Sequence, residues 1–266
     1  MILATLCVSH SALKSPPPAA SWRESSQSKM RKSILYNQNF FKDQRLVELI
    51  VRRLNIGPND FVYEIGPGRG MITRELAKTA GKVVAVEIDP RLCLPLQAEF
   101  AANPQVKIIN ADWLNYRVPE SNYKVFANIP FNLTAKIVNR LVTDRKFMEA
   151  FLVVQKEAAE KFTGTPKSTQ WSVLNQPWFE LQILYRFKRV DFFPRPSVKI
   201  VLLKISRRQK ALVKAKDKGD YYRLVLQGFN NWRRLSRELK FPLHVRPGDL
   251  TFPQWLGIFK FHLTHK

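Results

Sequence analysis

The chain has 266 residues, with 44 Lys or Arg against 21 Asp or Glu, so its formal net charge is +23. This excess of positive charge indicates a polyanionic partner such as nucleic acid. It is not a membrane signature, because no apolar stretch approaches the length of a spanning helix. Cys7 and Cys93 are far apart and lack Cys or His neighbours at metal spacing, which argues against structural zinc and favours the reducing cytoplasm.

Residues 1–32 differ in composition from the rest of the chain. They contain Pro16, Pro17 and Pro18, many serines and few large apolar residues, which predicts a disordered N-terminal extension. The first eight residues are apolar but lack a preceding basic stretch, so a secretory signal fits poorly. Two further hypotheses stay open, namely an organelle transit peptide and a translation start at Met30.

A strand, a glycine turn and a helix are predicted next, after an amphipathic helix near 46–54. Residues 61–65 form an apolar run that leads through glycines at 66, 68 and 70 into helical spacing from 71. This order opens nucleotide sites in doubly wound sheets, and glycine lets a ligand approach the backbone. The pattern from Glu64 is E-x-G-x-G-x-G, not the dinucleotide G-x-G-x-x-G. An acid inside the strand suits a ligand with a cationic end and no pyrophosphate, so S-adenosylmethionine fits better than NAD. A glycine turn without a ligand is the alternative.

Acidic residues follow the next two predicted strands. The strand at 82–87 ends in Glu87, about twenty residues after the turn, where an acid takes ribose hydroxyls. The strand at 106–109 is followed by Asp112, which would lie near an adenine amine. Each acid alone is more often a solvated loop residue. Three acids at successive strand ends, in this order, indicate a cofactor site.

The fourth predicted strand, at 123–128, runs into Asn128-Ile129-Pro130-Phe131. The Asn128 amide oxygen can accept a hydrogen bond from an exocyclic amine. Pro130 biases Ile129 towards an extended backbone, so the Ile129 carbonyl can point the same way. Phe131 offers a face on which a base can stack. The alternative is a strand that leaves the core through a proline turn, with Phe131 simply buried.

The remaining elements complete an α/β pattern. We predict a helix at 133–142, a strand at 151–155, a short helix at 156–162, an exposed loop at 163–170, and strands at 181–187 and 198–205. The β-α-β order predicts a mostly parallel sheet with helices on both faces, closed by a partly antiparallel pair.

The tail from 207 to 266 carries 14 basic and 4 acidic residues among several aromatic ones. Such a mixture suits phosphate contact and stacking, and also a helical domain with its aromatics inside and its charges outside. We therefore predict three regions: a disordered extension at 1–32, an α/β cofactor-binding domain at 33–206 and a small basic helical RNA-binding domain at 207–266.

Several of these motifs together resemble the rRNA adenine N6-dimethyltransferase family. They are residues 36–41, the glycine turn, Glu87, Asp112, Asn128 to Phe131 and residues 192–198, so that residues 33–206 are covered well and residues 229–237 weakly. The resemblance implies a Rossmann-like class I S-adenosyl-L-methionine-dependent methyltransferase domain with a small helical C-terminal domain. It implies catalytic roles for Asn128, Ile129, Pro130 and Phe131. It implies cofactor contacts for Gln38, Asn39, Phe41, Glu64, Gly66, Gly68, Glu87, Ile88, Asp112 and Asn128.

Two branches of that family are open. One modifies paired adenines of small-subunit rRNA and typically reads Asn-Leu-Pro-Tyr. The Erm branch modifies an adenine of 23S rRNA and confers macrolide–lincosamide–streptogramin B resistance, and Ile129, Phe131 and the short tail favour it. This implies a cytoplasmic monomer that needs no metal or membrane and acts on naked rRNA or an assembly precursor.

Two other classes remain open at this point. A DNA adenine methyltransferase uses a similar motif, but usually has proline at the position of Ile129 and a separate DNA-recognition domain. A non-catalytic relative could keep the fold, although the intact Glu64, Gly66, Glu87 and Asn128 argue against it. The target adenine and the number of methyl groups stay open.

Overall fold

The computed structural model describes residues 39–118, 121–238 and 245–264, and Gln38–Lys266 form one compact unit. The predicted extension at 1–32, Cys7 and Gln38 lie outside the described residues. No helix in the described ranges is long and apolar enough to cross a membrane.

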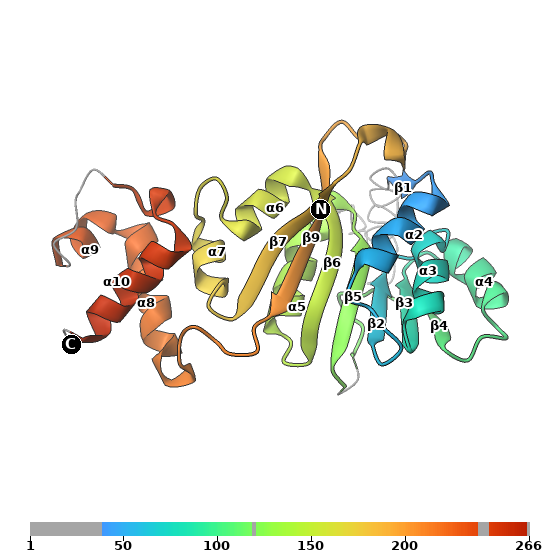
Figure 1. Ribbon diagram of the computed structural model, residues 1–266, viewed down its shortest axis with the longest axis horizontal. Helices are drawn as coiled ribbons and strands as arrows, with labels where there is room; N and C mark the ends of the chain where they lie inside the picture. Colours follow the sequence, from blue (N-terminus) through green and yellow to red (C-terminus); the bar gives the residue numbers. More distant parts are fainter. Residues whose placement is uncertain (1–38, 119–120, 239–244, 265–266) are drawn as a thin grey trace, which may run out of the picture. The chain divides into compact units, whose positions relative to one another are not determined.

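A seven-stranded sheet forms the centre of this unit (Figure 1). Its strands lie in the order β4 (Val106–Asn110), β3 (Lys82–Glu87), β2 (Phe61–Ile65), β5 (Tyr123–Asn128), β6 (Phe147–Gln155), β9 (Ile200–Arg207) and β7 (Phe179–Arg186). The first five are parallel, and β9 is antiparallel to both of its neighbours. The predicted α/β class and the antiparallel closing pair are confirmed.

Strand β6 begins at Phe147, earlier than the predicted residue 151, and it includes a charged residue within the ladder. Glu149 interrupts the apolar pattern, yet its side chain is buried. Its carboxylate accepts a hydrogen bond from Ser206 Oγ at 2.8 Å and pairs with Lys204 at 2.9 Å, both on the adjacent β9. A partner across the sheet therefore lets the strand run through an acid that sequence patterning reads as a boundary.

Helices cover both faces of the sheet because its strands alternate their side chains. On β3, Val83 faces one apolar cluster and Val84 the other. The cluster of Val83 takes in α2 (Gln44–Arg53), α3 (Met71–Thr79) and α4 (Pro90–Glu99). That of Val84 takes in α5 (Thr134–Thr143) and α6 (Lys156–Thr163).

Two short strands that the sequence did not predict form a second sheet. β1 (Phe40–Phe41) pairs antiparallel with β8 (Phe192–Phe193), and Lys42 N donates to Asp191 O at 2.9 Å. Directly opposite residues share a face. Phe41 and Phe192 are both buried, with ring centroids 4.8 Å apart. This contact joins segments about 150 residues apart, which is why local patterning does not reveal it.

The predicted loop at 163–170 is shorter than expected. Helix α6 extends to Thr163, and an additional helix α7 (Gln170–Asn175) starts at a capping box made by Thr169 and Ser172. Ser168 is buried, and its N–H donates to Gly248 O at 2.9 Å. The segment is thus held by the C-terminal helical part instead of being fully exposed.

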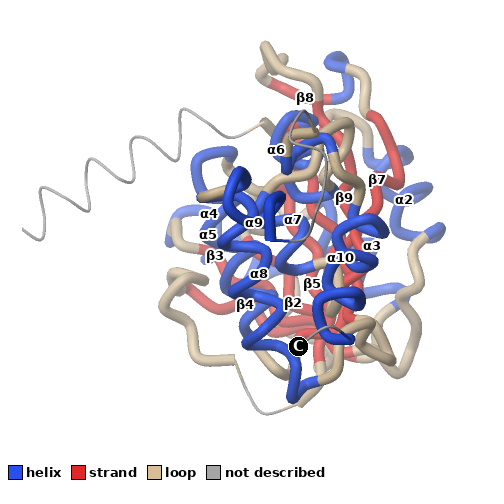
Figure 2. Tube along the Cα trace, turned by 90° about the vertical axis from the view of Figure 1, so that its left-hand side faces the viewer, coloured by secondary structure: helices blue, strands red, loops and turns tan. Residues whose placement is uncertain are grey.

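The C-terminal helices, whose paths Figure 2 shows, enclose an apolar cluster of their own. They are η3 (Ala215–Asp217), α8 (Lys218–Asn230), α9 (Trp232–Glu238), η4 (Pro247–Asp249) and α10 (Phe252–Thr264). Tyr221 and Trp255 are fully buried, whereas Phe261 is half exposed. Val173 of α7 joins the cluster, and its carbonyl accepts a 2.7 Å bond from Tyr221 Oη. The boundary at 207 stays a prediction.

Candidate active site

The glycine turn between β2 and α3 leaves its backbone open on one side. Gly66, Gly68 and Gly70 all have φ between 58° and 79°, a region that only glycine adopts without strain. A Cβ added at Gly66 would meet nothing within 4 Å, whereas at Gly68 it would lie 2.9 Å from the Phe40 ring and at Gly70 2.5 Å from Leu96. Gly66 therefore provides space for a ligand, and the other two glycines provide close packing.

Glu64 lies directly beneath this turn, in the buried part of β2. Its Oε2 accepts a 2.6 Å hydrogen bond from Thr73 Oγ1 at the start of α3. Its Oε1 is buried without a hydrogen-bond partner among the described residues. Burial raises the pKa of Glu64 to about 8, and the Thr73 bond offsets part of that rise. The sequence identified Glu64 but not Thr73.

Glu87 closes the same edge of the sheet from β3. Its Oε2 accepts from Gly68 N at 3.1 Å and its Oε1 from Asp89 N at 2.9 Å. Burial raises the pKa of Glu87, and bonds from the backbone N–H groups of Asp89, Gly68 and Ile88 act in the opposite direction. These bonds fix the carboxylate against the glycine turn. Ile88 is half-buried beside it.

Asp112 follows β4 and is joined to Glu87 through the backbone. The Glu87 carbonyl accepts from Asn110 Nδ2 and from Ala111 N, both at 2.9 Å. The Asp112 carboxylate accepts from Leu114 N at 2.9 Å and from Asn115 Nδ2 at 2.7 Å. Asp112 thus organises a turn, and its half-exposed side chain keeps lone pairs for a further donor.

Asn128 ends β5, the neighbour of β2 on the side away from β3. Its Nδ2 donates a 2.7 Å hydrogen bond to the backbone carbonyl of Asn39. This bond brings together Asn39 and Asn128, which are 89 residues apart in sequence, while Gln38 lies outside the described residues. Phe41 is buried against Phe192 and Phe187.

The three residues after Asn128 differ in exposure. Ile129 is buried in the core, and its N–H donates to Val153 O of β6 at 3.4 Å. Pro130 precedes the short helix η1 (Phe131–Leu133), and its carbonyl accepts from Leu133 N at 2.9 Å. Phe131 is half-buried and packs partly on the cluster formed with α2 to α4. It is neither fully in the core nor fully exposed, so part of its ring is accessible.

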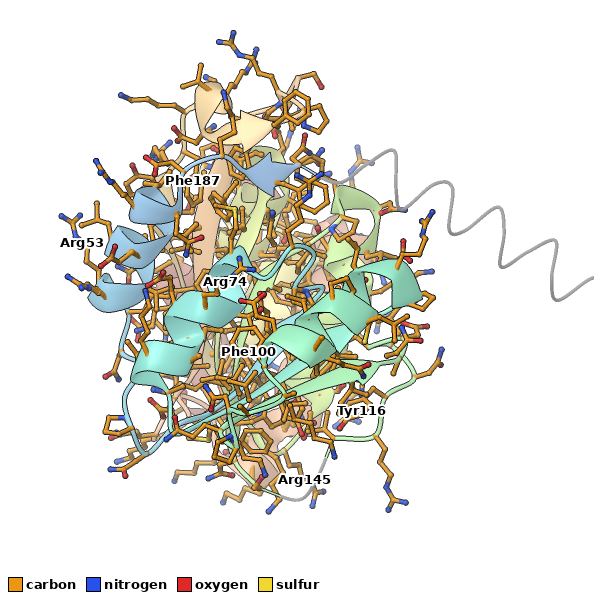
Figure 3. All side chains as sticks on the ribbon, turned by 90° about the vertical axis from the view of Figure 1, so that its right-hand side faces the viewer. Arg53, Arg74, Phe100, Tyr116, Arg145 and Phe187 are labelled. Carbon is orange, nitrogen blue, oxygen red and sulfur yellow. The ribbon has the colours of Figure 1, made fainter. Side chains whose placement is uncertain are left out.

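All these groups lie at the carboxyl edge of the parallel strands, where open α/β sheets bind ligands. Figure 3 shows the two edges: Phe187, which packs on Phe41, lies at the upper end, and Arg145, which precedes β6, at the lower end. An open glycine, an unpartnered buried carboxyl oxygen and a fixed second carboxylate suit a nucleoside with a cationic end. The residues therefore fit S-adenosyl-L-methionine.

Comparison with known proteins gives a consistent result. The family profile "Ribosomal RNA adenine dimethylase" matches residues 28–246. The ribosomal RNA small subunit methyltransferase A of Moorella thermoacetica is 34% identical over 74% of this chain and 74% of its own length. The rRNA adenine N-6-methyltransferase of Limosilactobacillus reuteri is 28% identical over 86% of this chain and 96% of its own length.

A solved structure matches most of the chain. The crystal structure of the 23S rRNA methyltransferase ErmE superposes with a TM-score of 0.76 at 27% identity, covering 84% of this chain and 98% of that one. A dimethyladenosine transferase from Plasmodium falciparum shares the fold, with a TM-score of 0.66 at 20% identity.

Proposed function

Because this chain belongs to the ribosomal RNA adenine dimethylase family, we propose that its target is an adenine of 23S rRNA and that the modification confers macrolide–lincosamide–streptogramin B resistance. At the coarser level the chain is an rRNA (adenine-N6)-methyltransferase that uses S-adenosyl-L-methionine. The proposal concerns the choice of RNA and its consequence.

The observation that carries the proposal is the motif Asn128-Ile129-Pro130-Phe131. Ile129 and Phe131 stand where the small-subunit branch typically has leucine and tyrosine. Ile129 is buried, so its β-branched side chain shapes the turn that presents the backbone carbonyl. Phe131 differs from tyrosine by lacking a hydroxyl, which leaves a purely apolar ring beside the base.

The structural comparison supports the same choice. ErmE superposes with a TM-score of 0.76 at 27% identity, against 0.66 at 20% identity for the dimethyladenosine transferase from Plasmodium falciparum.

The chemistry we propose for the site begins with the adenine amine, a poor nucleophile because its lone pair is delocalised into the ring. Asn128 Oδ1 and the Ile129 carbonyl accept hydrogen bonds from its two N–H groups. These bonds favour a tetrahedral nitrogen whose lone pair faces the cofactor. Bound S-adenosyl-L-methionine supplies an activated methyl group, so this chain needs to orient and enclose the base, and orientation carries most of the rate gain.

Around that centre, we assign stacking of the extruded base to Phe131, whose side chain is half-buried. Glu64 and Gly66 take the methionine end of the cofactor together with Asn39 and Gln38. Glu87 takes the ribose hydroxyls, and Asp112 the adenine amine. The basic part from 207 onward contacts RNA phosphates outside the site.

A second candidate is favoured by the similarity to small-subunit enzymes, among them that of Moorella thermoacetica at 34% identity. In that case the adenines would lie in 16S rRNA and their methylation would serve ribosome assembly without drug resistance. Both candidates use the same site, so only the RNA and the phenotype separate them.

Expression in an erythromycin-sensitive bacterium tests the choice. We expect the parent protein to raise erythromycin tolerance and to add N6-methyladenine to 23S rRNA, because methylation removes N–H donors and adds bulk at a base edge on which the drug packs. Asn128→Ala should abolish both effects. Asn175→Ala, which removes an amide in α7 away from the strand edge, is the matched control and should retain them.

A different pattern identifies the second candidate. If the parent gives no tolerance and instead restores 16S rRNA methylation in a strain lacking its own small-subunit dimethyltransferase, the 23S proposal is wrong. Mapping the modified base in both RNAs makes either result decisive.

A further inference from the structure

The side chain of Asn128 is held by one main-chain atom of a distant segment. Its Nδ2 lies 2.7 Å from the carbonyl oxygen of Asn39, which is 89 residues away in sequence. Only the NH2 group of an amide can donate to a carbonyl, and the reverse orientation would place two acceptor oxygens together. The contact therefore determines which end of the amide faces Asn39 and directs Oδ1 elsewhere.

The Asn39 carbonyl is itself fixed from two sides. The next residues form β1, which pairs with β8 through Phe40 and Phe41, and Lys42 N continues the ladder to Asp191 O at 2.9 Å. Phe41 is buried against Phe192, and the Phe40 ring packs on Gly68 of the glycine turn. The Asn39 carbonyl is thus positioned by the pairing of β1 with β8 and by the contact of Phe40 with the glycine turn.

We propose that Asn39 is a positioning residue whose backbone carbonyl locks the Asn128 amide so that Oδ1 is its acceptor for the adenine amine. The inference rests on the role proposed above for Asn128. It assigns to the main chain of the N-terminal strand a function that side-chain motifs do not show. It also explains why asparagine suits this position better than aspartate, because a carboxylate would present an acceptor to the Asn39 carbonyl.

Asn128→Asp tests this directly, because the partner is a backbone atom that substitution at Asn39 cannot remove. Below its pKa, the introduced carboxyl can donate its O–H to the Asn39 carbonyl and keep the C=O for the amine. Above that pKa, the carboxylate faces the carbonyl oxygen and is repelled. We therefore expect kcat of the variant, divided by kcat of the parent, to fall about tenfold per pH unit above that pKa.

The parent serves as the reference at each pH because other groups on these elements also titrate. They are Glu64 on β2, Glu87 on β3, Asp112 after β4, Lys156 after β6, and Lys42 and Asp191 beside β1 and β8. Their titration is common to both proteins and cancels in the ratio. The RNA is total rRNA, so kcat is measurable whichever subunit holds the target.

Thermal unfolding gives a readout that does not need activity. Repulsion by the Asn39 carbonyl should raise the pKa of the introduced carboxyl in the folded protein. The variant should then be closest to the parent in Tm at low pH and should lose Tm relative to it as pH rises through that raised pKa. A carboxyl that faced solvent would show no such trend.

The matched control is Asn175→Asp in α7. Asn175 Nδ2 also donates to a backbone carbonyl, that of Trp171 at 2.8 Å, but away from the strand edge. This control should show the pH-dependent loss of Tm with kcat unchanged.

Two results overturn the inference: a kcat ratio for Asn128→Asp that is constant from pH 5.5 to 8.5, or a Tm difference that does not change with pH. Absence of rRNA adenine methylation by the parent would instead refute the proposed function, and the Tm comparison would still test the lock.

Discussion

Glu64 is a buried carboxyl group whose pKa the fold raises above its ordinary value. Its ordinary pKa is 4.5, and burial raises it to about 8. At intermediate pH the unfolded chain has released this proton while the folded chain keeps it. The contribution of Glu64 to the free energy of unfolding is therefore fully present below the ordinary pKa and is lost as pH rises towards about 8.

We predict that Glu64→Gln makes the free energy of unfolding less dependent on pH between 5.5 and 8. Glutamine keeps an acceptor for Thr73 Oγ1 and cannot ionise. A smaller decline should remain, because burial also raises the pKa of Glu87. Urea denaturation at both pH values measures the effect, with Glu157→Gln on the exposed side of α6 as control. An unchanged decline in Glu64→Gln would show that Glu64 ionises freely in the folded protein.

Phe131 allows a second prediction at the scale of single residues. Phe131→Ala should lower kcat/KM for rRNA by roughly 10- to 100-fold, the range expected from about 1–3 kcal/mol of stacking per base. Phe131→Tyr and Phe131→Trp should retain much of the activity because both keep an aromatic face. Affinity for S-adenosyl-L-methionine, measured by calorimetry, should be unchanged in all three.

The control for this series is Phe261→Ala, which removes a half-exposed aromatic ring from α10. It separates the loss of stacking at the site from the loss of an aromatic surface in general. Full activity of Phe131→Ala would mean that Phe131 serves only core packing.

At the scale of elements, the sequence predicted the strands of the central sheet because their signals are local. Apolar runs, a glycine turn and acids at strand ends each lie within a few residues. Boundaries failed where a distant partner compensated for an unfavourable residue, as Ser206 and Lys204 do for Glu149. β1 and β8 were missed because two residues are too short for any periodicity, and their pairing depends on aromatic packing between remote segments.

The same limit applies to the candidate site. The order of Glu64, Glu87 and Asp112 along the chain correctly indicated neighbouring strand ends, because consecutive parallel strands place their carboxyl ends at one edge. The contact of Thr73 with Glu64 was not anticipated, since threonine in the first turn of a helix is common and carries no signal of its own. Likewise, Gly68 and Gly70 are needed for packing against Phe40 and Leu96, which spacing cannot distinguish from ligand contact.

For the whole molecule, the net charge of +23 bears on how RNA is held. Removing the chain from Arg207 onward is a poor test of this, because Arg207 Nε donates to Phe147 O at 2.8 Å and Tyr221 covers Val173. Neutralising exposed cations leaves those interactions intact and is the better experiment.

We predict that replacing Lys214, Lys216, Arg233 and Arg237 with glutamine weakens rRNA binding and flattens its salt dependence. The slope of log K against log salt should decrease by about 0.7–0.9 for each phosphate that the variant no longer neutralises. S-adenosyl-L-methionine affinity should be unchanged, since the cofactor residues lie at the edge of the sheet. Binding titrations at several salt concentrations measure both quantities.

A control of equal charge replaces four exposed cations away from the carboxyl edge, Lys82, Lys107, Arg145 and Lys146. Figure 3 shows Arg145 at the end opposite to Phe187. If this control weakens binding as much as the first set, the RNA footprint does not lie on the C-terminal helices.

The sequence by itself determined the α/β class, the family and the positions of the acids, the glycine turn and Asn128. These follow from residue types at short spacings, which can be recognised in the sequence without knowledge of the packing. Only the tertiary structure decided which end of the Asn128 amide faces the Asn39 carbonyl, that Glu64 is buried with a raised pKa, and that Phe131 is half-buried. Each of these depends on atoms brought together from distant parts of the chain, because burial and hydrogen-bond partners are properties of the packed molecule.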